Sequence, residues 1–224
     1  MAISLEKGQR INLEKGDGHK LTQFCVGCNW GAISVQSKKL FGLVSSEEKK
    51  SVDLDLSCVM VDVGGNICDH IYSPLYRREF LAGYGLPPGK LDSADRALHH
   101  SGDDRSGDQG DDDGLDNEII TVDLQRVSEN VAQIFFFLNN CGREDFSEIP
   151  YASIRMYEGT PSRVDTIFAR YDVATSAQFK NTRALIMGKL YRRNGEWKFS
   201  AIGDAYPDEN ICVTIERIAK QYAR

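Results

Sequence analysis

The segment 103–118 holds the side chains of this chain that are best suited to chemistry. It reads DDRSGDQGDDDGLDNE, with eight carboxylates against one arginine, so its charge of −7 exceeds the −6 of the whole protein. Carboxylates this close repel one another and stay ionised at neutral pH when water, salt or a bound cation offsets the repulsion. Oxygen ligands on a glycine-rich loop suit Ca²⁺. The segment therefore predicts a calcium site, with a solvated acidic loop that binds nothing as the alternative.

The known calcium loops do not fit this segment. In an EF-hand register that starts at Asp104, Ser106 and Asp108 occupy ligand positions, but Gln109 stands where Gly is needed and Leu115 where Glu is needed. The chain also lacks the nonapeptide repeats of a calcium β-roll. We therefore expect a calcium loop of another kind, held between two strands.

A second group of carboxylates precedes the acidic loop by about fifty residues. In 52–57 three apolar residues alternate with Asp53, Asp55 and Ser57, which predicts a strand with one apolar and one carboxylate face. Two loops at one end of a sandwich can share a metal cluster, so Asp53 and Asp55 are candidate additional ligands. Magnesium is the rival ion, but it usually needs only one or two carboxylates, and eight clustered acids suit calcium better.

The rest of the chain follows a strand pattern. Short segments rich in Val, Ile, Phe and Tyr are bounded by Gly, Asn, Asp or Pro. The predicted strands are 21–26, 31–36, 52–62, 67–72, 119–124, 131–138, 151–157, 166–172, 183–191 and 196–202. Asn194-Gly195 predicts a type I′ hairpin turn between the last two. Because no βαβ alternation is present, we expect an all-β antiparallel sandwich with long loops.

Three further segments complete the expected organisation. From Asp208 onward, apolar residues at spacings of three and four predict a C-terminal helix, the only helix expected. Residues 37–51 are interpreted as a polar loop, and 73–95 as an excursion from the sheet. A single domain is expected over 1–224.

Composition excludes several classes of function. No window approaches about 18 consecutive apolar residues, so no membrane-spanning helix is predicted. The N-terminus shows no secretory signal, so we expect a cytoplasmic protein. A pI near 5.3 argues against nucleic-acid binding. The six cysteines, among them the pair Cys25 and Cys28, are expected to be reduced and mostly buried, because no second Cys or His pair lies at zinc-site spacing.

A catalytic alternative rests on two histidines. His99 and His100 lie just before the acidic loop, and a metal-dependent phosphoester hydrolase would combine such residues with carboxylates. The chain has no GxSxG, HExxH or Walker-type motif. Binding without catalysis is therefore the favoured interpretation, and the hydrolase remains open.

Eight segments, in order along the chain, resemble the tellurium-resistance and stress-response family typified by TerD, and within it the longer TerZ- and TerX-like members. They are ISLEKG (3–8), VGCNW (26–30), VDLDLSC (52–58), HSGDD (100–104), IITVDL (119–124), IPYA (149–152), ARYD (169–172) and YRRNGEWKFSAIG (191–203). The resemblance implies a β-sandwich that binds calcium, usually two ions, through the acidic loop and the DLD segment. It also implies a cytosolic role in resistance to tellurite and other stress, together with other Ter-type proteins, some of them membrane-bound, and it implies no enzymatic activity.

The same resemblance supplies a ligand set. The metal ligands that it implies are Asp53, Asp55, Asp103, Asp104, Asp111, Asp116, Asn117 and Glu118. Three departures affect this set. Asn117 replaces an expected Asp and would give a carbonyl ligand with one less charge. Asn29-Trp30-Gly31 stands where the family usually has Gly-Trp-Asp, so an acid near the site is missing. The acidic run is also about three residues longer than usual, with Asp112, Asp113 and Leu115 as the expected extras.

Overall fold

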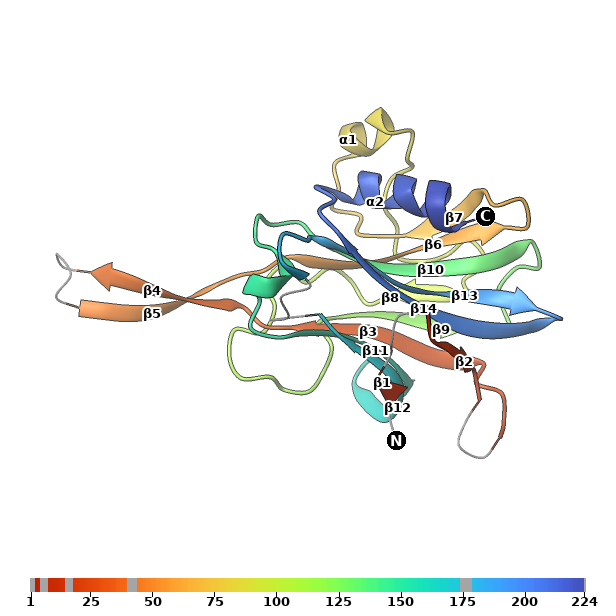
Figure 1. The fold of residues 1–224 in the computed structure, drawn as a ribbon, viewed down its shortest axis with the longest axis horizontal. Helices are drawn as coiled ribbons and strands as arrows, with labels where there is room; N and C mark the ends of the chain where they lie inside the picture. The colour runs from red at the N-terminus through yellow and green to blue at the C-terminus, as the bar shows by residue number, and fades with distance from the viewer. Residues whose placement is uncertain (1–2, 5–7, 15–17, 40–43, 174–178, 224) are drawn as a thin grey trace.

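Two six-stranded sheets face each other across an apolar core (Figure 1). The computed structural model describes residues 3–4, 8–14, 18–39, 44–173 and 179–223. The strands of the first sheet are, in spatial order, β1 (Ile3–Ser4), β12 (Arg163–Asp172), β11 (Ala152–Thr160), β3 (Gln23–Trp30), β9 (Glu118–Asp123) and β8 (Leu98–His100). The strands of the second sheet are β2 (Arg10–Asn12), β14 (Glu196–Tyr206), β13 (Ala184–Arg193), β10 (Val131–Asn140), β6 (Leu54–Asp62) and β7 (Ile67–Ile71). All neighbours are antiparallel except β1 and β12.

The alternation along β6 decides which side chains reach the core. Leu54, Leu56 and Cys58 point between the sheets, where they join the main core. Val59 belongs instead to a second apolar cluster on the outer face of the second sheet. Since successive side chains of a strand alternate, Asp55 lies on this outer face as well. The DLD segment thus has the apolar and carboxylate faces that its pattern predicts.

Helices cover the outer face of the second sheet. Helix α2 (Ile211–Arg217) continues into a π-helical turn (Ile218–Tyr222), and α1 (Arg78–Gly83) lies beside it in the excursion between β7 and β8 (Figure 1). The Asn210 side chain accepts hydrogen bonds from the N–H groups of Cys212 and Val213, which fixes the start of α2. The molecule therefore has three layers at this end: sheet, sheet and helix.

The remaining strands form an arm. β4 (Ile33–Lys39) and β5 (Val44–Lys50) pair only with each other among the described residues, and the hairpin projects from one end of the sandwich (Figure 1). The prediction of a loop over 37–51 is wrong for the residues that lie in β4 and β5. The polar composition of this segment fits a hairpin that projects into solvent equally well. The Phe41-Gly42-Leu43 part of that prediction lies outside the described residues.

The predicted sandwich is confirmed. Each of the ten predicted strands overlaps an observed one, and Asn194 and Gly195 have φ angles of 54° and 78°, as a type I′ turn requires. The C-terminal helix is confirmed too. The expectation of no other helix is wrong, since α1 and a 3₁₀ turn (Phe146–Glu148) are present. Strands β1, β2 and β8 were not predicted, because a strand of two or three residues is too short to show an alternation of apolar and polar side chains.

Candidate metal centre

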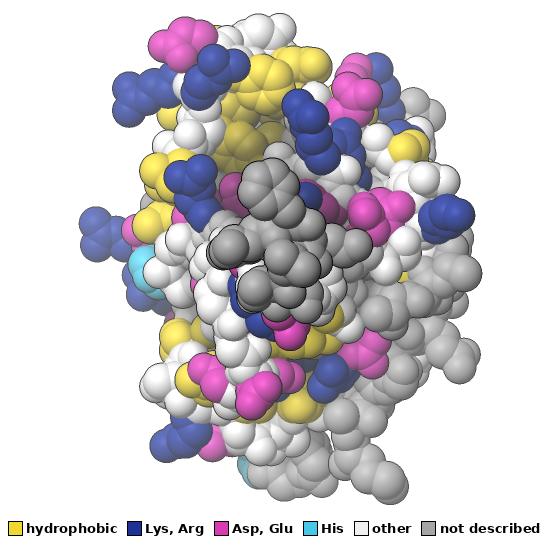
Figure 2. All heavy atoms as spheres, turned by 90° about the vertical axis from the view of Figure 1, so that its left-hand side faces the viewer, with side chains coloured by type: hydrophobic (Ala, Val, Ile, Leu, Met, Phe, Trp, Pro, Cys, Tyr) yellow, Lys and Arg dark blue, Asp and Glu magenta, His cyan; other side chains and the backbone are white. Residues whose placement is uncertain are grey.

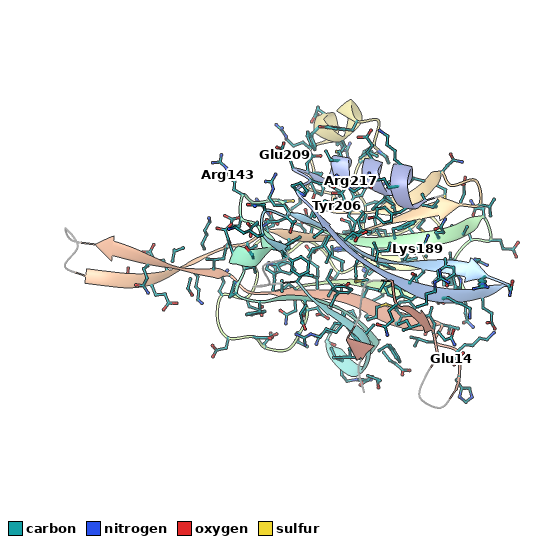
Figure 3. All side chains as sticks on the ribbon, in the orientation of Figure 1. Glu14, Arg143, Lys189, Tyr206, Glu209 and Arg217 are labelled. Atoms are coloured by element: carbon teal, nitrogen blue, oxygen red, sulfur yellow. The ribbon has the colours of Figure 1, made fainter. Side chains whose placement is uncertain are left out.

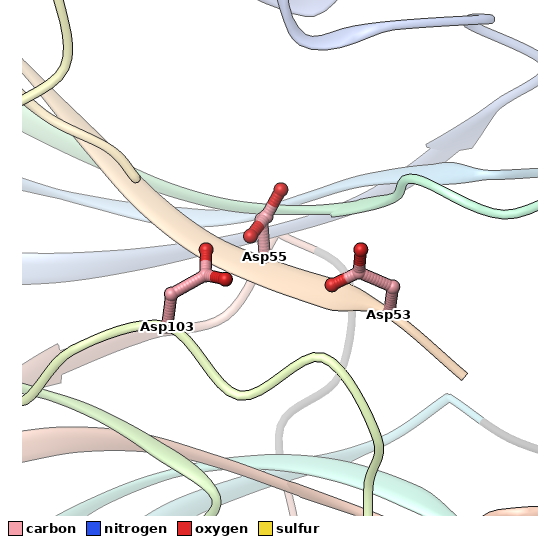
Figure 4. Close-up of side chains that lie close together, drawn as sticks. All are labelled: Asp53, Asp55 and Asp103. Carbon is pink, nitrogen blue, oxygen red and sulfur yellow. The ribbon is translucent and has the colours of Figure 1, made fainter. Parts of the chain in front are cut away.

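Three carboxylates converge where β6 meets the loop that follows β8. Asp53, Asp55 and Asp103 each offer an oxygen, and these oxygens lie within 4.8 Å of one another (Figure 4). We call this group the inner cluster. The prediction that the DLD segment and the start of the acidic loop meet is supported by this geometry. A cavity of about 350 Å³ lies over the cluster, lined also by Ser73, Leu75, Tyr76, Arg105 and Cys141.

Long-range pairing brings Asp103 to β6. The N–H of Ser101 donates to the Ile119 carbonyl at 2.8 Å, and the N–H of Gly102 donates to His100 Nδ1 at 3.0 Å. Gly102 has φ 117°, a conformation that favours glycine. The chain therefore turns out of the sheet just before Asp103 and presents this carboxylate to the second sheet.

The inner cluster is poorly compensated by protein groups. Asp55 is 4% exposed, and its Oδ2 accepts hydrogen bonds from the Tyr76 hydroxyl and from Cys141 Sγ. Burial, together with the charges of Glu118 and Asp103, raises the pKa of Asp55 well above its usual value. Burial and Asp103 also raise the pKa of Asp53, and Arg105, 3.7 Å away, opposes this only in part.

One oxygen of the inner cluster has no partner. Asp53 Oδ1 is buried and makes no hydrogen bond with any described residue. A buried acceptor without a donor costs free energy that a bound cation would recover. Three carboxylates with an open acceptor form a donor set that suits a hard divalent ion such as Ca²⁺.

A second group of acids lies further along the loop. Asp108, Asp112 and Asp113 also bring carboxylate oxygens within 4.8 Å of one another, and Asp112 and Asp113 are exposed. We call this group the outer cluster. It lies at the end of the sandwich that carries the β4–β5 arm, where acidic side chains alternate with Lys and Arg over the surface (Figure 2).

The outer cluster has many hydrogen-bond partners. Asp108 accepts from the Tyr151 hydroxyl at 2.7 Å and from Asn117 Nδ2 at 2.9 Å. Asp112 accepts from Asn29 Nδ2 at 2.9 Å and from the Gly114 N–H at 2.8 Å, and these bonds lower its pKa. Asn29 itself is 5% exposed and its Oδ1 has no partner in the described part of the chain. This open oxygen lies two positions before Gly31, which stands where the family has its acid.

Several predicted ligands frame the loop. Asp104 caps a turn by accepting from the N–H groups of Ser106 and Gly107. Asn117 Oδ1 accepts from the Trp30 N–H at 2.8 Å, so Asn117 joins the loop to β3. These contacts fix the loop's conformation between the two clusters.

The other predicted ligands have different surroundings. Asp116 is buried and forms a two-oxygen ion pair with Arg155, at 2.9 and 3.1 Å. Glu118 is 1% exposed and accepts from the N–H groups of Leu56 at 2.7 Å and Asp104 at 2.9 Å. Asp111 is exposed and belongs to neither cluster.

The structure thus brings together three of the eight predicted ligands, Asp53, Asp55 and Asp103. The remaining five stay predictions. Sequence reasoning missed the outer cluster as a group, because Asp112 and Asp113 were interpreted as an insertion. Gly110 and Gly114, on either side of these acids, were the available signal that the chain turns tightly there.

The two histidines point to opposite faces of β8. His100 is 1% exposed, its Nε2 lies 3.0 Å from the Leu56 carbonyl, and its Nδ1 accepts from Gly102. His99 is exposed and contacts Asp92 at 2.9 Å. The two rings therefore cannot act on one substrate, and His100 has both nitrogens occupied by the backbone.

All six cysteines are free, and four of them are buried, as expected. Cys28 lies in the main core, whereas Cys25 packs with Ile119 and Tyr157 on the outer face of the first sheet. No helix among the described residues has the length and apolarity to cross a membrane.

A comparison with known families agrees with the resemblance in the sequence. The TerD-domain model matches residues 1–222. The chain belongs to the TerD-domain family. It is 30% identical over 221 residues to the stress response protein SCP2 of Bacillus subtilis, covering 97% of this chain and 99% of that protein. It is also 30% identical to the tellurium resistance protein TerZ of Serratia marcescens, covering 91% of this chain and 90% of TerZ.

Solved structures show the same fold. A Streptomyces coelicolor A3(2) homologue of the telluride resistance protein TerD superimposes with a TM-score of 0.58 at 14% identity, covering 91% of this chain and 98% of that chain. A protein of unknown function, SAV2460, gives a TM-score of 0.59 at 17% identity, covering 90% and 96%. Both support the sandwich topology of this family member.

Proposed function

We propose that this TerD-family protein is a calcium-binding module of the stress response that acts by binding and not by catalysis. The observation that carries the proposal is the inner cluster, in which two of three converging carboxylates have raised pKa values and Asp53 Oδ1 is buried without a partner. Each of these features disfavours the cation-free state at neutral pH.

A second ion is proposed at the outer cluster. Its carboxylates are largely satisfied by hydrogen bonds, so its need for a cation is smaller, but Asn29 Oδ1 adds an open oxygen beside Asp112. Two ions would offset the −7 of segment 103–118 more fully than one. We expect the inner cluster to bind calcium more tightly than the outer cluster.

Bound calcium would supply positive charge that the protein lacks at this end. Asp53 and Asp55 would hold the cation from the second sheet, and Asp103 would hold it from the loop that follows β8 of the first sheet. The ordered loop and the neighbouring β4–β5 arm would then form a surface for other Ter-type proteins, including membrane-bound ones, in the cytoplasm. A phosphoester hydrolase has no support from the histidine positions.

Calorimetric titration of chelator-stripped protein tests the proposal. We expect Ca²⁺ to bind with a stoichiometry near two and to outcompete Mg²⁺, because many carboxylates and few waters favour the larger ion. Calcium should also raise the melting temperature, since it binds only the folded state. An absence of heat, or an equal response to Mg²⁺, would contradict the calcium assignment.

A further inference from the structure

A buried row of polar side chains runs from the inner cluster across the outer face of the second sheet. Asn139 on β10 stands directly opposite Asp55 on β6, and Ser57 follows two residues along β6. Residues directly opposite in an antiparallel pair share a face. Asp55, Ser57 and Asn139 are 4%, 0% and 1% exposed. The row therefore lies in the layer between the second sheet and the helices.

At its far end the row meets α2 and an ion pair. Arg217 donates to both oxygens of Asp208, at 3.0 and 2.5 Å, and stacks on Tyr206, 3.9 Å from its ring centroid (Figure 3). Asp208, held by this arginine, can only accept hydrogen bonds. The Thr214 hydroxyl has one proton to donate, and its acceptors are Asp208 Oδ2 at 3.3 Å and the Asn210 carbonyl at 3.5 Å.

These two acceptors set the direction of the hydrogen bond to Asn139. Because the single Thr214 proton goes to one of them, the Thr214 oxygen accepts from Asn139, whose Nδ2 lies 2.9 Å away. The amide of Asn139 is therefore fixed with Nδ2 toward α2 and Oδ1 away from it. Asn139 Oδ1 has no partner among the described residues, and neither does Ser57 Oγ.

Two acceptors thus stand at opposite positions of the β6–β10 pair. With a cation bound at the inner cluster, the Asp55 carboxylate is ionised and accepts through Oδ2 from Tyr76 and Cys141, so it has no proton to offer to Asn139 Oδ1. A donor between them resolves the conflict, and a water molecule with three polar neighbours meets the usual requirement for a buried water. It would donate to Asn139 and Asp55 and accept from Ser57.

We propose that Asp55, Ser57 and Asn139 bind one buried water molecule, and that this water completes a polar relay coupling cation binding at the inner cluster to the packing of α2. The inference rests on the proposed calcium site. Asn139 and Thr214 are positioning residues for Asp55, and they do not touch the cation. Coupling between two sites is reciprocal, so calcium stabilises α2 and intact packing of α2 raises calcium affinity.

Thr214→Val tests the relay away from the ligands, because valine keeps the shape of threonine and removes the hydroxyl. We expect calcium affinity to fall roughly tenfold, at the low end of outer-shell changes at metal sites. Thr214→Ser keeps the hydroxyl and should restore the wild-type affinity. Asn139→Leu, which removes the Oδ1 acceptor, should match Thr214→Val. Ser93→Ala, a buried hydroxyl at the edge of the first sheet, is the control and should leave affinity unchanged.

Amide hydrogen exchange gives a second measurement. Calcium should slow exchange over Ile211–Arg217 in the wild type and in Thr214→Ser, but not in Thr214→Val. The relay is overturned if the wild type binds calcium and Thr214→Val binds it equally well. It is also overturned if calcium leaves the exchange rates of the α2 amides in the wild type unchanged. A wild type that binds no calcium overturns the proposed function together with the relay.

Discussion

The inner and outer clusters are built from the same side chain in opposite environments. Asp53 and Asp55 of the inner cluster are buried or half-buried, and burial raises their pKa values. Asp112 of the outer cluster is exposed, and hydrogen bonds from Asn29 and Gly114 lower its pKa. Without a cation, burial therefore disfavours the ionised form of Asp53 and Asp55, whereas hydrogen bonds already stabilise the ionised form of Asp112.

Local charge density alone does not identify the stronger of the two proposed ion sites. The run 111–113 is the densest acidic stretch of the chain, yet the exposed Asp112 and Asp113 side chains accept turn hydrogen bonds from Gly114 and Leu115. The inner cluster joins residues that are about fifty positions apart and lies against β6. Desolvation and the small number of donors, and not the number of acids, favour a cation there.

Asp116 differs from both clusters, because the positive charge of Arg155 compensates its carboxylate. Arg155→Met should lower the free energy of unfolding by about 3–5 kcal/mol, since it leaves the Asp116 charge buried and unpaired. Urea denaturation with calcium present measures this loss. The number of bound calcium ions should stay unchanged if Asp116 pairs with Arg155 and does not bind calcium. Loss of one bound calcium in Asp116→Asn would instead make Asp116 a ligand.

Removing charge from the inner cluster should have the next largest effect. In Asp53→Asn/Asp55→Asn, we expect calcium affinity at this site to fall on the order of 100-fold or more, since charge count tunes such sites. The melting temperature of the chelated variant should equal or exceed that of the wild type, because the repulsion is gone. Calorimetry and thermal unfolding check both statements. A chelated variant that is clearly less stable would contradict the electrostatic account.

The outer cluster should respond less. Asp108→Asn/Asp112→Asn should weaken one binding step by roughly tenfold and leave the tighter step intact, because an exposed site is hydrated and screened by salt. Asp111→Asn is the matched control, as Asp111 is exposed in the same loop but outside both clusters. If Asp111→Asn weakened binding as much as the double variant, the assignment of the outer ligands would be wrong.

The smallest effect concerns pH. The pKa values of Asp53 and Asp55 are raised in the folded protein, so between the unfolded value near 3.8 and the raised values the folded state binds more protons than the unfolded state. In chelator, their contribution to stability should therefore fall as pH rises through this window. A shift of the melting temperature of about 2–4 °C per kcal/mol is expected for a chain of this size. Saturating calcium should abolish this dependence. If the chelated wild type did not lose stability over the window relative to chelated Asp53→Asn/Asp55→Asn, the prediction would be contradicted.

Sequence patterns predicted the regular parts of the fold. The alternation in 52–57, the Asn194-Gly195 turn and the C-terminal apolar spacing are local signals, and each appears as expected. The end of β4, strand β5 and α1 could not be predicted in this way, because polar strands and very short helices have no apolar period. For the candidate site, the alternation of Asp53 and Asp55 was enough to place both on one face.

By itself, the sequence determined the sandwich, the family and the presence of a concentrated negative charge, because strand period, turn residues and charge are properties of neighbouring residues. Only the tertiary structure decided how each acid is compensated. Arg155 is 39 residues from Asp116, and Asn29 is 83 residues from Asp112. The partners that stabilise or disfavour a carboxylate come from other strands, so the fold, and not the acidic run, determines which acids need a cation.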